Sequence, residues 1–177
     1  MDDAVNQQER RPITEEFKWF MAGFIEGEGS FTVSIKPHPT QKFRCYIDPD
    51  FYLYQHKNRR GILEMAREMF GTGNIYPKPG NENVLTFHIS SRRSVCEKIL
   101  PFIEKYMKFS YKRKTLDLYK EIVLALENKE HSTVSGMLRI IDMAYEMNPE
   151  GKVRKRPKQE VIDLILRDHT PKSQEAT

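Results

Sequence analysis

Two acidic side chains, Glu26 and Glu28, stand in a segment rich in glycine. Residues 21–31 read Met-Ala-Gly-Phe-Ile-Glu-Gly-Glu-Gly-Ser-Phe, so Glu28 has a glycine on each side. Glycine lacks a Cβ, and a ligand can therefore approach the backbone around Glu28 closely. A carboxylate presented in this way suits a hard cation such as Mg²⁺, which binds one or two carboxylates together with phosphate oxygens and water. The pattern predicts a metal site at Glu28; the alternative is a solvated surface glutamate.

The spacing around this segment predicts a helix that passes directly into a strand. Thr14 is typical of an N-cap, and apolar side chains recur at helical intervals up to Ile25. Gly27 and Gly29 are expected to end the helix. Beyond them the apolar period changes to two, which predicts a strand over residues 30–36.

The remaining chain continues the alternation of helices and hairpins. We expect a second strand over 42–54 with a bend or bulge at Pro49, a second helix over 57–70, and a second hairpin over 74–90. Further helices are expected at 92–105, 112–128, 133–147 and 159–168. This order predicts an α+β fold, with an αββαββ core, an antiparallel four-stranded sheet and C-terminal helices.

Length and composition narrow the class of protein. The 177 residues predict one domain over 13–168, with a flexible arm over 1–12 and a flexible tail over 169–177. No apolar run is long enough for a transmembrane helix, and the acidic N-terminus does not resemble a signal peptide. Cys45 and Cys96 are too few for a disulfide framework, so we expect an intracellular protein that is not secreted and has no membrane partner.

One face of the predicted sheet carries a mixed set of hydrogen-bond donors and acceptors. Such a face can read base edges in the major groove of DNA, and an ordinary solvated face is the alternative. Basic residues also cluster over 105–114 and 152–158, where they suit phosphate backbones or form solvated helix faces. The side chains assigned to the sheet face are Thr32, Ser34, Lys36, Arg44, Tyr46, Asp48, Asp50, Tyr52, Tyr76, Lys78, Thr86 and His88.

The segment over residues 21–31 resembles the LAGLIDADG motif of homing endonucleases, in the spelling L-A-G-F-x-D-G-D-G-S. Met21 stands for the leading Leu, and Glu26 and Glu28 replace the two Asp. The order of elements over residues 14–128 is also similar to that family. The resemblance implies an intron-encoded, site-specific endonuclease that hydrolyses both strands of DNA. It also implies Mg²⁺ as cofactor, with Mn²⁺ as a possible substitute, and no small-molecule cofactor.

The resemblance assigns roles within the motif. Glu28, with the backbone of Gly27, is expected to bind the metal, whereas Glu26 has a structural or helix-end role. Only one motif is found, and single-motif members act as homodimers on long, pseudo-palindromic sites. The expected dimer interface comprises Ala22, Gly23, Glu26 and Gly27.

The resemblance also assigns catalytic residues outside the motif. Gln55 ends the second strand and Arg59 begins the next helix, which matches the family's water-orienting glutamine and a nearby basic residue. Lys112 precedes a long helix and corresponds to a lysine that stabilises charge on the phosphoryl group, with Lys108 as the alternative register.

Two other functional classes remain open at this stage. A nucleic-acid-binding protein that does not cleave, either an intron RNA maturase or a DNA-binding regulator, is compatible with the same elements. The acid at Glu28 favours catalysis over that alternative. A purely structural α+β domain would leave the motif, the basic clusters and the mixed sheet face without explanation. The five histidines show no metal-ligand spacing, so zinc chemistry is not expected.

Overall fold

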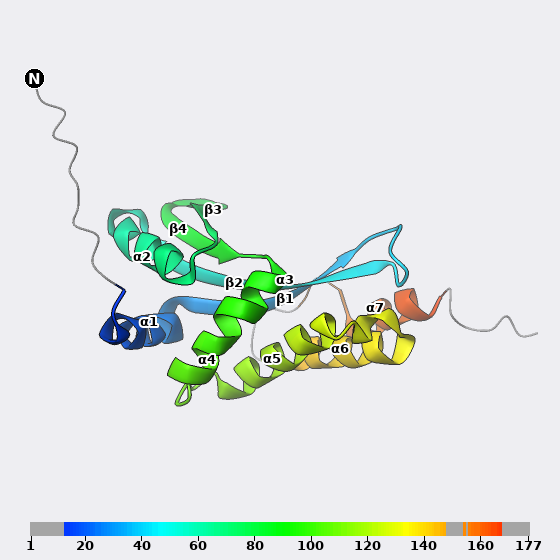
Figure 1. The fold of residues 1–177 in the computed structure, drawn as a ribbon. Coiled ribbons are helices and arrows are strands. Elements are labelled where there is room, and N and C mark those ends of the chain that lie inside the picture. Colours follow the sequence, from blue (N-terminus) through cyan, green and yellow to red (C-terminus); the bar gives the residue numbers. More distant parts are fainter. Residues whose placement is uncertain (1–12, 148–153, 155, 168–177) are drawn as a thin grey trace, which may run out of the picture.

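The computed structural model describes residues 13–147, 154 and 156–167, so the arm predicted over 1–12 and the tail predicted over 169–177 lie outside the described residues. A four-stranded antiparallel sheet with the order β1-β2-β4-β3 forms the centre, and helices pack against it (Figure 1). In this part of the chain no helix has the length and apolar character needed to cross a membrane.

The predicted α+β class and αββαββ order are confirmed, and most boundaries agree within three residues. The core consists of α1 (Glu15–Glu28), β1 (Gly29–Pro37), β2 (Cys45–His56), the 3₁₀ turn η1 (Lys57–Arg59), α2 (Arg60–Phe70), β3 (Asn74–Lys78) and β4 (Asn81–Ile89). The following helices are α3 (Arg92–Ser94), the π-helical turn η2 (Val95–Ile99), α4 (Leu100–Tyr106), α5 (Arg113–Glu127), the 3₁₀ turn η3 (Glu130–Ser132), α6 (Val134–Glu146) and α7 (Lys158–Leu166).

The second strand differs from the prediction in two respects. β2 begins at Cys45, and Arg44 lies in the preceding loop with a φ of 52°, so its expected place on the strand face is wrong. No bulge forms at Pro49, which pairs with Val33 in continuous register. Because β4 pairs with β2 only from Phe51 onwards, the strand has a free edge at Pro49 where a missing N–H donor is tolerated.

The apolar side of the sheet and the helices share one core. Phe51 and Leu53 of β2 are completely buried, as is Tyr119 of α5. The rings of Phe31 and Tyr119 meet edge to face at 5.5 Å between centroids. Met21 from α1 is buried in the same cluster. This packing fixes α1 and α5 against the sheet, and both helices contribute to the site described below.

Candidate active site

Helix α1 delivers Glu28 directly to the start of β1. The sequence predicted that the helix ends near Gly27, but it continues to Glu28. Gly29 then enters the strand with φ −86° and ψ 145°. A Cβ atom on Gly29 would lie 2.5 Å from the carbonyl oxygen of Ile25, so this sharp junction requires glycine. The junction leaves the side chain of Glu28 exposed at the end of the helix.

Lys112 reaches the same junction from the beginning of α5. Its Nζ atom donates a hydrogen bond to the carbonyl oxygen of Gly29 at 3.0 Å, and the side chain is half-buried. Lys108 is exposed in the loop between α4 and α5. The geometry therefore favours Lys112 over Lys108 as the lysine beside Glu28.

The strand register brings Gln55 to the same end of the sheet. Gly29 pairs with Leu53, so Gln55 follows just beyond the point where α1 meets β1. The Oε1 atom of Gln55 accepts a hydrogen bond from the backbone N–H of His56 at 2.7 Å. Arg59 is exposed at the end of η1, where the chain leads into α2. Glu28 and Lys112 thus lie at one junction, Gln55 lies at the same end of the sheet, and Arg59 lies further along the chain.

Glu26 binds the chain's own α4–α5 loop. Its carboxylate accepts hydrogen bonds from the Ser110 hydroxyl at 2.5 Å and from the Tyr111 backbone N–H at 3.1 Å. The Ser110 hydroxyl oxygen in turn accepts from the backbone N–H of Lys112 at 3.0 Å. This arrangement matches the structural role expected for Glu26 and positions the start of α5. The carboxylate, which the sequence had assigned to the dimer interface, is thus engaged by a loop of its own chain.

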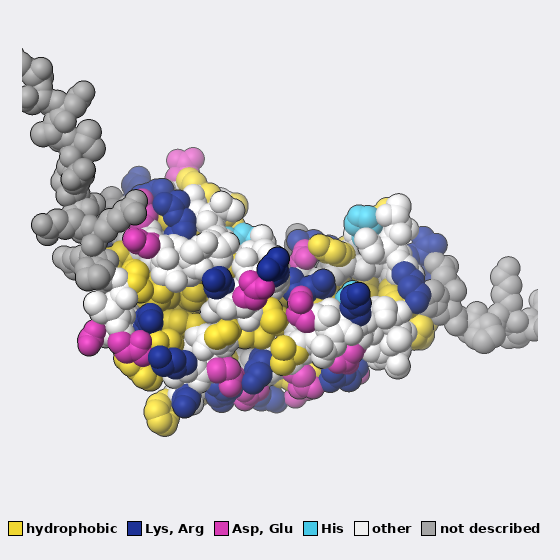
Figure 2. Space-filling model, viewed as in Figure 1, with side chains coloured by type: hydrophobic (Ala, Val, Ile, Leu, Met, Phe, Trp, Pro, Cys, Tyr) yellow, Lys and Arg dark blue, Asp and Glu magenta, His cyan; other side chains and the backbone are white. Residues whose placement is uncertain are grey.

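The open side of α1 is glycine-rich and aromatic. Ala22 is 6% exposed and packs in the core, so it offers little surface to a second copy of the chain. Gly23 and Gly27 are exposed, and a Cβ on either would meet no described atom within 4 Å apart from the neighbouring residues and the backbone of α1 itself. Phe20 is 58% exposed and its ring stacks on that of Phe24. Yellow apolar side chains gather where α1, α2 and α4 come together (Figure 2).

The oxygen donors at the α1–β1 junction are too few to form a complete metal site from the protein alone, but they fit a cation that a phosphate group also binds. Among the described residues, no three His, Cys, Asp or Glu side chains gather in a way that could hold a metal ion. Glu28 and the carbonyl group of Gly27 offer oxygen donors, the type that Mg²⁺ prefers. Since Mg²⁺ commonly takes only one or two carboxylates and completes its shell with phosphate and water, these residues fit a cation bound together with a phosphate ligand.

The strand register pairs several of the residues that the sequence assigned to the polar face of the sheet. Thr32 pairs with Asp50, Lys36 with Tyr46, and Tyr76 with Thr86. The sequence also assigned Asp50 and Thr86 to this face as exposed side chains. They are only 3% and 2% exposed, so both are buried under neighbouring side chains. Lys36 forms a 2.9 Å ion pair with Asp48 across β1 and β2.

Several described residues of the two basic clusters make contacts within the chain, among them Lys105 with Glu15 and Lys114 with Glu146. Arg154 donates to the backbone carbonyls of Val33 and Ala144 at 2.9 and 2.6 Å, and burial lowers its pKa. Arg156, just before α7, pairs with Glu160 in the first turn of that helix. Figure 2 shows basic and acidic side chains interspersed along α5 and α6.

Three exposed or half-buried aromatic residues near the candidate sites were given no role in the sequence analysis. Tyr54 lies on the polar face with Tyr52, its ring stacked at 6.2 Å between centroids. Phe109 and Tyr111 are fully exposed beside Ser110, next to the open side of α1. The presence of two aromatic residues in a short loop between helices is the feature of the sequence that could have predicted this apolar surface.

Comparison with known proteins identifies the class to which this fold and junction belong. The family model for LAGLIDADG endonucleases matches residues 21–123. The chain is 37% identical to the DNA endonuclease I-CeuI of Chlamydomonas moewusii over 132 residues, which are 73% of this chain and 61% of that protein. The structure of I-CeuI complexed with DNA gives a TM-score of 0.82 at 30% identity, covering 89% of this chain and 79% of that chain.

Two further structures show the same architecture. The archaeal intron-encoded homing endonuclease I-Vdi141I, complexed with DNA, gives a TM-score of 0.80 at 32% identity, covering 87% of this chain and 98% of that one. I-SmaMI, bound to an uncleaved DNA target in the presence of calcium ions, gives a TM-score of 0.70 at 27% identity, covering 75% and 45%. The chain belongs to the LAGLIDADG endonuclease family, whose members are metal-dependent nucleases.

Proposed function

We propose that this chain is a site-specific, intron-encoded endonuclease that hydrolyses phosphodiester bonds in both strands of DNA. The observation that carries the proposal is the placement of Glu28 and Lys112 at the α1–β1 junction, where Lys112 is bonded to Gly29 at 3.0 Å and Gln55 lies at the same end of the sheet. The names of the similar proteins, three of them with structures bound to DNA, support the same activity.

The chemistry follows from the side chains at the junction. A bound divalent cation supplies Lewis acidity and lowers the pKa of coordinated water, and we propose Mg²⁺, with Mn²⁺ as a possible substitute. Glu28 would hold this cation together with the Gly27 carbonyl. Gln55 orients a water molecule through its amide, and the ammonium group of Lys112 stabilises negative charge that develops on the phosphoryl group. Arg59 contributes positive charge at the margin of the site.

The active form is proposed to be a homodimer. Glycine inside a helix costs about 0.5–1 kcal/mol relative to alanine, so Gly23 and Gly27 call for a packing reason. The described residues provide none within 4 Å of either position. A second copy of α1, approaching closely over these glycines and beside Phe20, supplies that reason and brings two Glu28 carboxylates toward opposite strands. A two-fold dimer predicts a long, pseudo-palindromic DNA site.

The polar face of the sheet is the proposed base-reading surface. Lys36 and Tyr46 lie at one end of this face, and Tyr54, Tyr76 and Lys78 lie at the other. Hydrogen-bond donors and acceptors at both ends of the face can distinguish base pairs in the major groove. The runner-up function, binding without cleavage by a maturase or regulator, uses the same surface.

A cleavage assay on a plasmid library separates these two functions. The purified chain is incubated with supercoiled plasmids carrying randomised inserts, with Mg²⁺ or with EDTA. Linear product that depends on Mg²⁺ and maps to one sequence supports the endonuclease. Retention of one sequence on the protein, with the plasmid uncut in Mg²⁺ and in Mn²⁺, would favour the binding protein.

A further inference from the structure

A buried carboxylate lies under the polar face of the sheet. Asp50 is 3% exposed, and one of its oxygens accepts a hydrogen bond from Nε2 of His88 at 2.8 Å. The other oxygen accepts from the Ser34 hydroxyl at 3.3 Å. Both carboxylate oxygens are thereby engaged within the protein, so Asp50 acts on its neighbours and does not reach a ligand directly.

The imidazole ring of His88 is fixed between Asp50 and Tyr76. The Tyr52 ring stacks on it, with 4.2 Å between centroids and 11° between planes. On the side away from Asp50, Nδ1 of His88 lies 3.1 Å from the hydroxyl oxygen of Tyr76. Asp50, His88 and Tyr76 therefore form a chain of hydrogen bonds that runs from β2 through β4 to β3; we call this chain the relay.

The chemistry of the three groups sets the direction of each hydrogen bond. An ionised carboxylate can only accept, so Nε2 of His88 carries the hydrogen. In a neutral imidazole the other nitrogen is then an acceptor, and the Tyr76 hydroxyl must donate to it. Burial, with a contribution from the Asp50 charge, raises the pKa of Tyr76 and keeps that hydroxyl protonated. The remaining lone pairs of the Tyr76 oxygen are left for another partner.

We propose that Asp50 and His88 are positioning residues that hold Tyr76 as a hydrogen-bond acceptor toward DNA, so that Tyr76 selects a base with an exposed amino group. In the major groove these bases are adenine, through N6, and cytosine, through N4. The inference rests on the proposed function, because it assumes that the polar face of the sheet meets DNA bases.

The test is a binding selection from randomised double-stranded DNA, without divalent metal and at mildly alkaline pH. The wild-type chain should prefer adenine or cytosine at one base position in each half-site. Tyr76→Phe removes the acceptor and leaves Asp50 and His88 bonded to each other. Its preference at that position should fall about tenfold, while the other positions keep theirs.

Asp50→Asn is the more informative variant, because it should invert the base preference and not merely weaken it. The asparagine amide can donate to Nε2 of His88, which moves the ring hydrogen to Nδ1 and makes that nitrogen the donor to Tyr76. The Tyr76 hydroxyl then turns its hydrogen outward, and the preference should invert toward guanine or thymine, which present acceptors. A purely structural role of Asp50 would weaken binding at all positions and would not invert one of them.

Tyr54→Phe serves as the matched comparison: it removes a hydroxyl from the same base-reading surface but outside the relay, so any change in preference should fall at a base position other than that of Tyr76. Inversion in Asp50→Asn together with loss in Tyr76→Phe supports the proposal. An unaltered preference in Tyr76→Phe overturns it, as does a flattened but uninverted preference in Asp50→Asn at wild-type melting temperature. A wild-type chain that selects no DNA sequence would instead contradict the proposed function.

Discussion

The side chain of Lys112 and the backbone of Gly29 are 83 residues apart in sequence, yet they are joined by a hydrogen bond of 3.0 Å. This contact ties the start of α5 to the point where α1 becomes β1. It places a half-buried ammonium group one residue away from the exposed Glu28. The backbone N–H of Lys112 also donates to the Ser110 hydroxyl, which in turn donates to Glu26. These two hydrogen bonds fix the start of α5.

Replacing Lys112 by methionine should reduce cleavage strongly and leave DNA binding largely intact. The substitution keeps most of the apolar stem and removes the charge, and losing one group that stabilises a transition state costs about 100- to 1000-fold in rate. Single-turnover cleavage with saturating protein measures the effect. Lys108→Met is the matched control, since that side chain is exposed in the same loop. A larger loss in Lys108→Met would reverse the assignment.

Glu28→Gln should abolish cleavage while preserving or tightening DNA binding, because it removes the metal-binding charge and its repulsion of phosphates. Glu26→Gln should cleave more efficiently than Glu28→Gln but melt at a lower temperature than wild type. Its carboxylate holds two hydrogen bonds, and hydrogen bonds to charged groups contribute about 1.5–3 kcal/mol each. Cleavage and thermal melting of both variants decide the matter; a Glu28→Gln protein that cuts at the wild-type rate would exclude Glu28 as the metal ligand.

Gly23→Leu should disrupt the dimer without unfolding the chain. Apart from the neighbouring residues and the backbone of α1 itself, no described atom lies within 4 Å of a Cβ at Gly23, so the chain has room there for a larger side chain that would obstruct a second copy. Ala22→Leu is the contrasting variant, because Ala22 is buried and overpacking costs about 1–3 kcal/mol of stability. Sedimentation should show twice the chain mass for wild type and the single mass for Gly23→Leu. A wild-type chain that stays monomeric on DNA and still cuts both strands would refute the two-fold arrangement.

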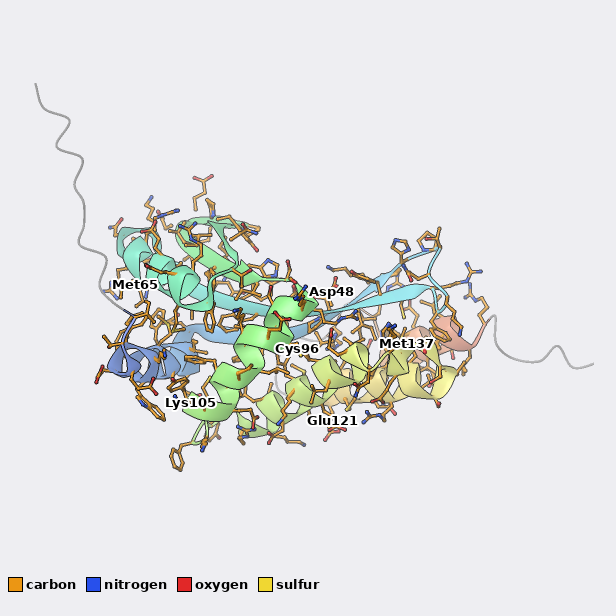
Figure 3. All side chains as sticks on the ribbon, viewed as in Figure 1. Asp48, Met65, Cys96, Lys105, Glu121 and Met137 are labelled. Atoms are coloured by element: carbon orange, nitrogen blue, oxygen red, sulfur yellow. The ribbon has the colours of Figure 1, made fainter. Side chains whose placement is uncertain are left out.

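The contact between α1 and α4 should make stability depend on pH in acid. Lys105, which is labelled in Figure 3, donates to Glu15 at 2.8 Å, and this bond, with that of the Tyr106 hydroxyl, lowers the pKa of Glu15 from 4.5 to about 2. Because the folded pKa is lowered, the stabilisation is complete above the unfolded value of 4.5 and is lost as the pH falls toward 2. Melting curves of wild type and Glu15→Gln should therefore differ most near neutral pH and converge in strong acid. Curves that diverge in acid would contradict the assignment.

Lys78→Ala should weaken binding at particular base pairs, by about 1–3 kcal/mol where the lysine makes a good base contact. Its Nζ atom lies 4.8 Å from the centroid of the Tyr54 ring, on the proposed base-reading surface. Arg156→Ala is the comparison, since Arg156 pairs with Glu160 on the side of the C-terminal helices. Titrations against matched and mismatched duplexes measure both. Uniform weakening by Lys78→Ala over all duplexes would indicate a phosphate contact instead.

The alternation of elements and the position of the motif were determined by the sequence itself. Apolar side chains at a period of 3.6 up to Ile25 and of two beyond Gly29 are local features, so they predict a helix followed by a strand without knowledge of the fold. The same reasoning predicted both hairpins and the C-terminal helices. It failed locally at Arg44, whose positive φ delays the start of β2, and at Pro49, which is tolerated because β4 does not pair with that part of β2.

Only the tertiary structure decided which distant groups meet. The preference for Lys112 over Lys108, the hydrogen bonds of Glu26 and the burial of Ala22 depend on how α1 packs against the α4–α5 loop and the core. The 2.8 Å contact between Asp50 and His88 depends on the pairing of β2 with β4, which joins residues 38 positions apart. Periodicity shows which side of an element is apolar, but contacts between elements arise only when the packed core fixes their relative positions.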